Sequence, residues 1–136
     1  MLKQENKKEN DMLPEKQILV VEDEPEFAEL VKARLEMAGY VVSIAWDAYA
    51  GTQAILKKEF DLIILDLMMP AGGGLAILER IQNFPGKLHI PVVILTGKVI
   101  DNELKAHLSE LNVSAIFAKP YNSIEFLSKI QSLLSV

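Results

Sequence analysis

The chain contains no cysteine, and it has one tryptophan among its 136 residues. Without cysteine, neither a disulfide nor a thiolate metal site can form. No apolar stretch approaches the ~18 residues of a membrane span, and no apolar segment follows the N-terminal lysines as it would in a signal peptide. We therefore expect no membrane association and a cytoplasmic location.

Basic residues are also in short supply, with 14 Lys and Arg against 19 Asp and Glu. A net charge of −5 argues against a nucleic-acid-binding surface spread over the whole domain. Half of the residues are hydrophobic, and a chain of this length forms one domain with a core of its own.

The N-terminal residues, 1–16, are polar, with lysines and acidic residues in equal number and no apolar period. We expect a flexible N-terminal extension there and a single domain over residues 17–136. The extension and the end of the chain after the last helical segment favour a free-standing protein over an excised domain.

From Gln17 onward, short apolar runs alternate with amphipathic segments. The runs, rich in Val and Ile, predict strands at 18–21, 40–44, 62–65, 92–95 and 113–117. The segments between and after them predict helices at 25–38, 48–58, 74–82 and 100–111, and a last one after Asn122 or Ser123. This alternation predicts an α/β fold: a doubly wound, five-stranded parallel sheet with helices on both faces.

Three acidic residues follow two of the predicted strands. Glu22 and Asp23 come directly after the first strand, and Asp66 comes directly after the third. If these strands are neighbours, the carboxylates converge, and their mutual repulsion favours a bound cation. Oxygen ligands without Cys or a nearby His favour Mg²⁺ or a similar hard ion. Alternatively, Glu22 and Asp23 belong to a solvated loop that caps the first helix.

Two further strand ends carry polar side chains. Thr96 ends the fourth strand and Lys119 follows the fifth. Taken singly, each could be an ordinary exposed residue. Together with the acidic trio, a hydroxyl and an ammonium are what an incoming phosphoryl group requires for its oxygens.

At this point the chain resembles the receiver domain of two-component response regulators, in particular the single-domain, chemotaxis-regulator-like members. The resemblance extends from about Lys16 to the C-terminus. Its most specific segments are ILVVEDEP (18–25), DLIILDLMMPAGGG (61–74), PVVILTGK (91–98) and AKP (118–120).

The resemblance implies a flavodoxin-like sheet of strand order 2-1-3-4-5. It implies that Asp66 accepts a phosphoryl group in a Mg²⁺-dependent reaction. Metal ligands would be Asp23, Asp66 and the main-chain carbonyl of Met68, with Glu22 acting directly or through water. Thr96 and Lys119 would hold the phosphoryl oxygens, and the peptide bond before Pro120 would be cis.

The same resemblance implies a signalling role rather than that of an enzyme with a separate substrate, because the domain catalyses only its own phosphorylation and dephosphorylation. The phosphodonor would be a sensor histidine kinase or a histidine phosphotransfer protein. A downstream protein would bind the face made by the fourth helix, the fifth strand and the fifth helix.

One position departs from the family. Many receivers carry Tyr or Phe three residues before the conserved Lys, but here that residue is Ile116. The neighbouring Phe117 should point to the other face of its strand. We therefore expect the output to pass through residues 97–101 and the fourth helix, and to be read mainly at Lys98, Lys105 and His107. Gly97, where the family often has Ala, should leave the site more open.

Two other functions fit parts of the pattern. A metal-dependent phosphohydrolase could pass through an aspartyl phosphate, but it needs a second Asp where this chain has Met68. A degenerate receiver that is never phosphorylated is the other alternative, although every expected site residue is present.

Overall fold

The computed structural model describes residues 15–70, 73–97 and 100–135. Strands and helices alternate along the chain: β1 (Gln17–Val21), α2 (Pro25–Met37), β2 (Val41–Ala45), α3 (Ala48–Lys57), β3 (Leu62–Leu65), α4 (Gly73–Ile81), the short 3₁₀ helix η1 (Pro85–Lys87), β4 (Val92–Thr96), α5 (Asn102–Glu110), β5 (Val113–Ala118) and α6 (Ser123–Leu134). The predicted extension 1–16 lies almost wholly outside the described residues.

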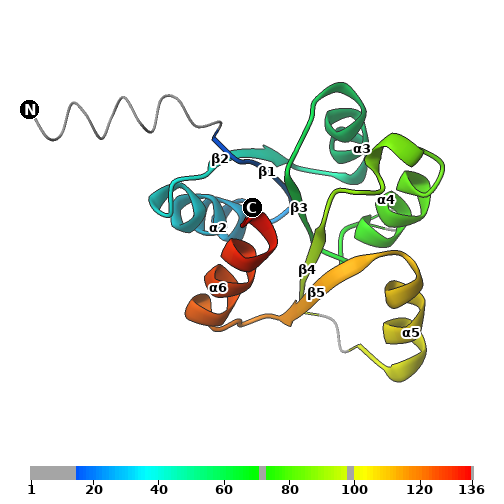
Figure 1. The fold of residues 1–136 in the computed structure, drawn as a ribbon. Coiled ribbons are helices and arrows are strands. Elements are labelled where there is room, and N and C mark those ends of the chain that lie inside the picture. Colours follow the sequence, from blue (N-terminus) through cyan, green and yellow to red (C-terminus); the bar gives the residue numbers. More distant parts are fainter. Residues whose placement is uncertain (1–14, 71–72, 98–99, 136) are drawn as a thin grey trace, which may run out of the picture.

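The five strands form one parallel sheet in the order β2-β1-β3-β4-β5. Helices α2 and α6 cover one face, and α3, α4 and α5 cover the other (Figure 1). β1 and β3 are adjacent, with Val21 paired to Leu65, so the residues that follow these two strands leave the sheet side by side. The predicted fold class and strand order are confirmed.

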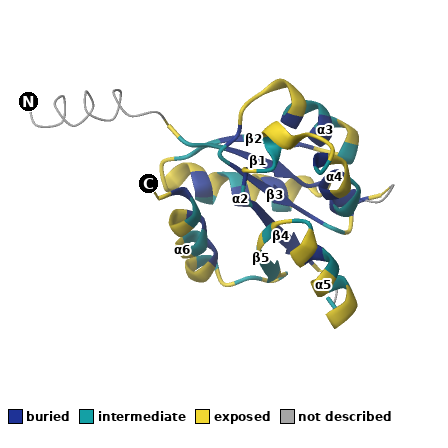
Figure 2. Cartoon of the chain, turned by 45° about the vertical axis from the view of Figure 1, so that its right-hand side comes forward, coloured by how far each residue is buried: buried dark blue, intermediate teal, exposed yellow. Residues whose placement is uncertain are grey.

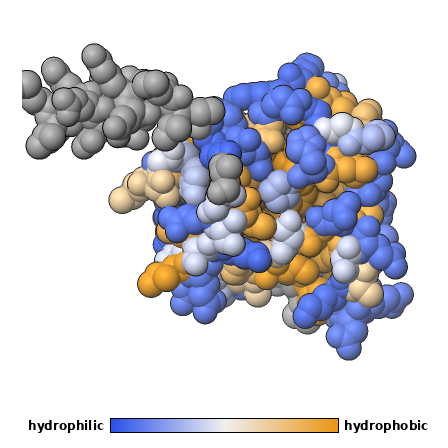
Figure 3. All heavy atoms as spheres, viewed as in Figure 1, coloured by the Kyte–Doolittle hydropathy of each residue, from blue (hydrophilic) through white to orange (hydrophobic). Residues whose placement is uncertain are grey.

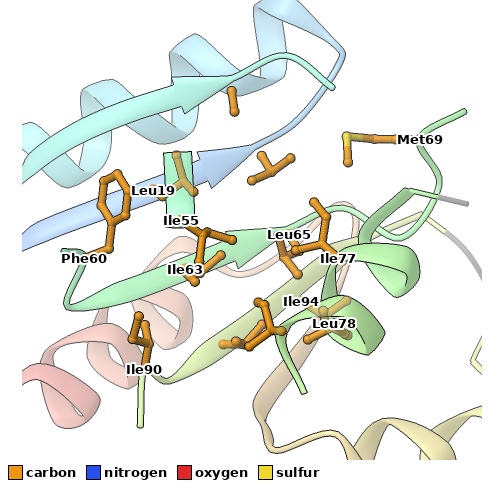
Figure 4. Packing of buried hydrophobic residues seen from close by; sticks show 14 of the residues in the cluster. Leu19, Ile55, Phe60, Ile63, Leu65, Met69, Ile77, Leu78, Ile90 and Ile94 are labelled. Carbon is orange, nitrogen blue, oxygen red and sulfur yellow. The ribbon is translucent and has the colours of Figure 1, made fainter. Parts of the chain in front are cut away.

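Two apolar layers hold the helices to the sheet, because neighbouring residues of a strand point to opposite faces. On the α3 and α4 side, the cluster contains Leu19, Ile63 and Ile94 from the strands and Ile55 and Ile77 from the helices (Figure 4). The other cluster joins Ile18, Val20 and Ile64 to side chains of α2 and α6. The central strands β1, β3 and β4 are almost wholly buried, whereas the edge strand β5 is half-buried (Figure 2).

Local sequence signals set several helix boundaries. Pro25 opens α2, and Gly39 follows its end with φ of 99°, a conformation that glycine adopts without strain. The Asn122 side chain accepts hydrogen bonds from the backbone N–H groups of Ile124 and Glu125 at the start of α6. None of the helices in the described part of the chain is both long enough and apolar enough to cross a membrane.

Candidate functional site

The carboxyl ends of β1 and β3 bring the predicted acidic residues together. Carboxylate oxygens of Glu22, Asp23 and Asp66 lie within 4.8 Å of one another. Glu22 and Asp66 are buried, and Asp23 is exposed. This donor set consists of oxygen atoms alone, which suits Mg²⁺, and its exposed member leaves the cluster open to solvent. The residues present therefore fit a hard divalent cation.

Lys119 joins this cluster from the end of β5. Its Nζ lies 2.5 Å from Glu22 Oε1 and 3.2 Å from Asp66 Oδ2, and its backbone N–H donates to the carbonyl oxygen of Thr96 at 2.9 Å. The side chain is only 15% exposed, so the ammonium is directed into the site rather than into solvent. The bond between Lys119 and Pro120 is cis, as the resemblance implied.

Burial and hydrogen bonding set the charge of the two buried carboxyl groups. Burial is the largest cause that raises the pKa of Glu22 to about 7, and the Asp66 carboxylate adds to it against the opposing effect of Lys119. Burial also acts to raise the pKa of Asp66, but hydrogen bonds from Glu22 and the Met68 N–H, together with Lys119, outweigh it and lower that pKa. Of the two buried carboxyl groups, Asp66, the predicted nucleophile, is therefore the more readily ionised.

The ammonium of Lys119 remains charged in this setting. Burial would lower its pKa, but the hydrogen bond and charge of Glu22, and then those of Asp66, outweigh burial and raise the pKa of Lys119. A cation is thus held 3.2 Å from Asp66, where it can offset the charge of an incoming anion.

A cavity of about 500 Å³ adjoins this cluster. It is lined by residues from the ends of β4 and β5 and from the region of α5: Thr96, Gly97, Ile100, Lys105, Ile116, Ala118 and Lys119. Thr96 is fully buried at the end of β4 and pairs in register with Ala118. Among the described residues, a Cβ atom added at Gly97 would meet one atom, the Met68 sulfur at 3.8 Å, so space remains beside this residue.

Ile116 and Phe117, neighbours in β5, were predicted to point to opposite faces of the sheet. Phe117 packs against Phe126 on the α2 and α6 side, while Ile116 belongs to the opposite cluster, which confirms that they point to opposite faces.

Met68 donates its backbone N–H to Asp66 Oδ1 at 2.9 Å. The role of its carbonyl as a metal ligand stays a prediction, and Lys98 lies outside the described residues.

The sequence did not single out Phe27, in the first turn of α2. Its ring centroid lies 4.0 Å from Nζ of Lys119. Phe27 precedes the buried residues Val31 and Leu35 at helical spacing, which predicts an inward-facing position. Contact with a residue 92 positions later depends on the tertiary fold, and the sequence pattern carries no signal for it.

Comparisons with known proteins agree with this geometry. The model of the response regulator receiver domain family matches residues 18–131. The transcriptional regulatory protein DltR of Streptococcus agalactiae is 35% identical over 114 residues, which are 84% of this chain and 50% of that protein. The chain spans about half the length of the relatives that it matches in sequence.

Solved receiver structures share the fold. The CheY-like receiver domain from Methanospirillum hungatei superposes with a TM-score of 0.81 at 28% identity and covers 89% of this chain and 94% of that one. Response regulator TrrA of Thermotoga maritima, solved in complex with Mg²⁺-BeF, gives a TM-score of 0.75 at 30% identity, covering 88% and 99%. With the family model matched along most of its length, this chain belongs to the response regulator receiver domain family.

Proposed function

We propose that residues 17–136 act as a phosphoacceptor domain in which Asp66 takes a phosphoryl group from a phosphohistidine, with Mg²⁺ bound at Glu22, Asp23 and Asp66. The observation that carries the proposal is the Asp66 carboxylate, buried at the end of β3 with the Lys119 ammonium 3.2 Å away. The Mg²⁺-BeF complex of TrrA supports it, because beryllofluoride mimics a phosphoryl group on a carboxylate.

The chemistry follows from the charges of the site. A carboxylate attacks an anionic phosphoryl group slowly unless positive charge offsets the repulsion. Lys119 would supply one such positive charge and would donate hydrogen bonds to the phosphoryl oxygens. The Thr96 hydroxyl, at the end of the neighbouring strand β4, would also donate to these oxygens. Bound Mg²⁺ would supply further positive charge and align the oxygens. A P–O bond to Asp66 forms as the P–N bond breaks, and its electron pair leaves with the imidazole nitrogen.

The partners belong to the same proposal. A sensor histidine kinase or a histidine phosphotransfer protein would supply the phosphoryl group. The acyl phosphate on Asp66 would then carry about −1.5 to −2 charge in total, on more oxygen atoms than the carboxylate it replaces, and Thr96 and Lys119 would turn toward these oxygens. A downstream protein would bind the face made by α5, β5 and α6. A phosphohydrolase is not favoured, because Met68 occupies the position of its required second Asp.

Intact-mass measurement tests the function directly. Incubation with acetyl phosphate and Mg²⁺ should add the mass of one phosphoryl group, and omission of the divalent cation should prevent the addition. Asp66→Asn should abolish it, because the amide is no nucleophile toward phosphorus. Equal labelling of the Asn variant would place the phosphoryl group elsewhere, and unlabelled wild type would indicate a degenerate receiver.

A further inference from the structure

Lys119 has an uncharged neighbour in addition to its carboxylates. Its Nζ contacts Glu22 and Asp66, lies 3.8 Å from Glu24, and stands 4.0 Å from the centroid of the Phe27 ring. An ammonium over the face of an aromatic ring is attracted to the electron-rich π system, and the attraction grows when the cation is removed from water. At 15% exposure, the Lys119 side chain is largely removed from water.

The Phe27 ring differs from the carboxylates in how its contact with Lys119 responds to cation binding and to phosphorylation of Asp66. Glu22 and Asp66 belong to the acidic cluster that fits a divalent cation, so a bound cation competes with Lys119 for their oxygens. Phosphorylation of Asp66 would place one of its two carboxylate oxygens in the new P–O bond. The Phe27 ring does not compete with carboxylates for Mg²⁺ and does not react with the phosphoryl group. Its attraction for the ammonium therefore remains both when a cation binds and when Asp66 is phosphorylated.

The Phe27 ring is itself fixed by contacts that join α2 to α6. It meets the ring of Tyr121 edge to face, with centroids 6.0 Å apart and planes at 83°. Tyr121 packs on the fully buried Phe126 at 4.8 Å, and its hydroxyl accepts a hydrogen bond from Nη1 of Arg34 at 2.9 Å. Because Tyr121 follows Lys119 by two residues, this stack fixes the ring and the lysine backbone together.

We infer that Phe27 is a positioning residue, whose ring holds the Lys119 ammonium at the phosphoacceptor site after a cation has engaged the carboxylates. The inference rests on the proposed function, since it concerns the ammonium that would contact the phosphoryl oxygens. The ring acts through Lys119 and touches neither the phosphoryl group nor the metal ligands' oxygens in this role.

Leucine at this position tests the ring, because it keeps an apolar side chain and removes the π face. Phe27→Leu should weaken beryllofluoride binding, measured by calorimetry in excess Mg²⁺, about 3- to 30-fold, the range expected of a cation–π contact. The initial rate of phosphorylation by acetyl phosphate should fall similarly. Phe27→Tyr, which restores a ring, should stay within about twofold of wild type. Phe27→Met offers a second ring-free variant should leucine pack poorly.

Phe117→Leu is the matched control. Phe117 belongs to the same apolar cluster and packs edge to face on Phe126 at 5.6 Å, but it is not the ring over Lys119. Its replacement should lower the thermal midpoint while leaving beryllofluoride affinity within about twofold of wild type, below the range expected for loss of a cation–π contact. A loss of affinity equal to that of Phe27→Leu would assign the effect to core packing and overturn the inference.

A double-mutant cycle isolates the path through the lysine. In a Lys119→Met background, Phe27→Leu should cause no further loss in the phosphorylation rate, because the cation is already absent. An undiminished loss there, or a Phe27→Leu variant equal to wild type, would overturn the inference and leave the function intact. Wild type that takes neither beryllofluoride nor a phosphoryl group would overturn the proposed function itself.

Discussion

At the residue scale, the position of Lys119 decides how the site responds to an anion. Its ammonium lies 3.2 Å from Asp66 Oδ2. Glu22, at 2.5 Å, holds it in the unmodified protein. If Asp66 is phosphorylated as proposed, we expect the lysine to exchange a carboxylate partner for phosphoryl oxygens, a charge-assisted contact that exists only after modification.

Lys119→Ala should reduce the stabilisation that beryllofluoride confers, because the variant lacks the ammonium that would contact this phosphoryl mimic and binds it less tightly. With Mg²⁺ and beryllofluoride at about 100 times the dissociation constant, wild type should gain about 2.7 kcal/mol in the free energy of unfolding, and the variant should gain much less. Thermal unfolding with and without the ligand measures the difference. Lys87→Ala, which removes an ion pair with Glu59 in the turn after α4, is the control and should keep the wild-type gain. Equal gains in the Lys119 variant would contradict its role.

The raised pKa of Glu22 makes stability depend on pH. Its pKa is about 7 in the folded protein against 4.5 ordinarily, so the folded state binds this proton more tightly. The resulting stability is fully present below pH 4.5 and is lost as the pH rises through about 7. The lowered pKa of Asp66 acts in the opposite direction, but below 3.8, outside this window.

In EDTA, the thermal midpoint of the wild-type protein should therefore decrease as the pH is raised from 4.5 to 7. Glu22→Gln, which carries no titrating proton, should show a flatter profile over the same range. A wild-type midpoint that rises throughout this window would show that Glu22 is already ionised in the folded protein at acidic pH.

At the scale of elements, some boundaries could be predicted from sequence and others could not. Strand β3 was predicted at 62–65 and is found there, because a buried apolar run ends abruptly at Asp66. Helix α5 was predicted from Ile100 but begins at Asn102, since the Asp101 side chain accepts a hydrogen bond from the Leu104 N–H and caps it. The 3₁₀ turn Pro85–Lys87 carried no periodic signal and was not predicted.

The candidate site was predictable to the extent that it depends on topology. Parallel strands deliver the residues after their carboxyl ends to one edge, so the acidic trio and Lys119 were expected together and are found together. The Phe27 ring over Lys119 depends on how α2 packs against the end of β5. Such side-chain contacts between distant segments have no local pattern from which they could be predicted.

Gly74, at the start of α4, packs so closely on the backbone of Asp66 that a side chain at this position would clash with it. The Gly74 N–H donates to the Asp66 carbonyl oxygen at 3.0 Å, and a Cβ atom on Gly74 would lie 2.7 Å from that oxygen. Helix propensity favours alanine over glycine by about 1 kcal/mol, but here the clash is with backbone that cannot rotate away. The backbone of Asp66 would have to shift.

Gly74→Ala should lower the free energy of unfolding by about 1–3 kcal/mol and slow phosphorylation of Asp66. Urea denaturation and intact-mass kinetics measure the two effects. Gly86→Ala is the matched control, because a Cβ atom there meets none of the residues that the structure describes within 4 Å, and it should be nearly neutral. If the two variants are equally stable, helix α4 adjusts without moving Asp66.

At the scale of the whole molecule, the sheet separates two apolar layers, and the site lies where strands from its centre end. Hydrophilic residues cover much of the face shown in Figure 3, with hydrophobic residues gathered toward its middle. A signal from Asp66 must reach an outer face through elements that can move. Among the described residues, a cavity of about 500 Å³ lies between the ends of β4 and β5 and the region of α5.

This arrangement predicts an output carried by α5 rather than by β5. Ile116 lines that cavity in place of a large ring, and a β-branched side chain without a polar tip differs little in exposed surface between its rotamers. Amide chemical shifts recorded with and without beryllofluoride should therefore change strongly at Gly97 and over 100–108, and little over 115–117. Surface residues Lys105 and His107 of α5 would then present the change to a partner.

Variants on the two elements separate this route from the alternative. Lys105→Ala should weaken binding of the downstream partner while phosphorylation stays normal, because it alters the exposed face of α5. Ile116→Ala should leave that binding nearly unchanged, since the strand contributes little to the signal. Large shifts confined to 115–117, or an Ile116→Ala variant that is phosphorylated normally but no longer binds the partner, would place the readout in β5 despite the missing aromatic ring.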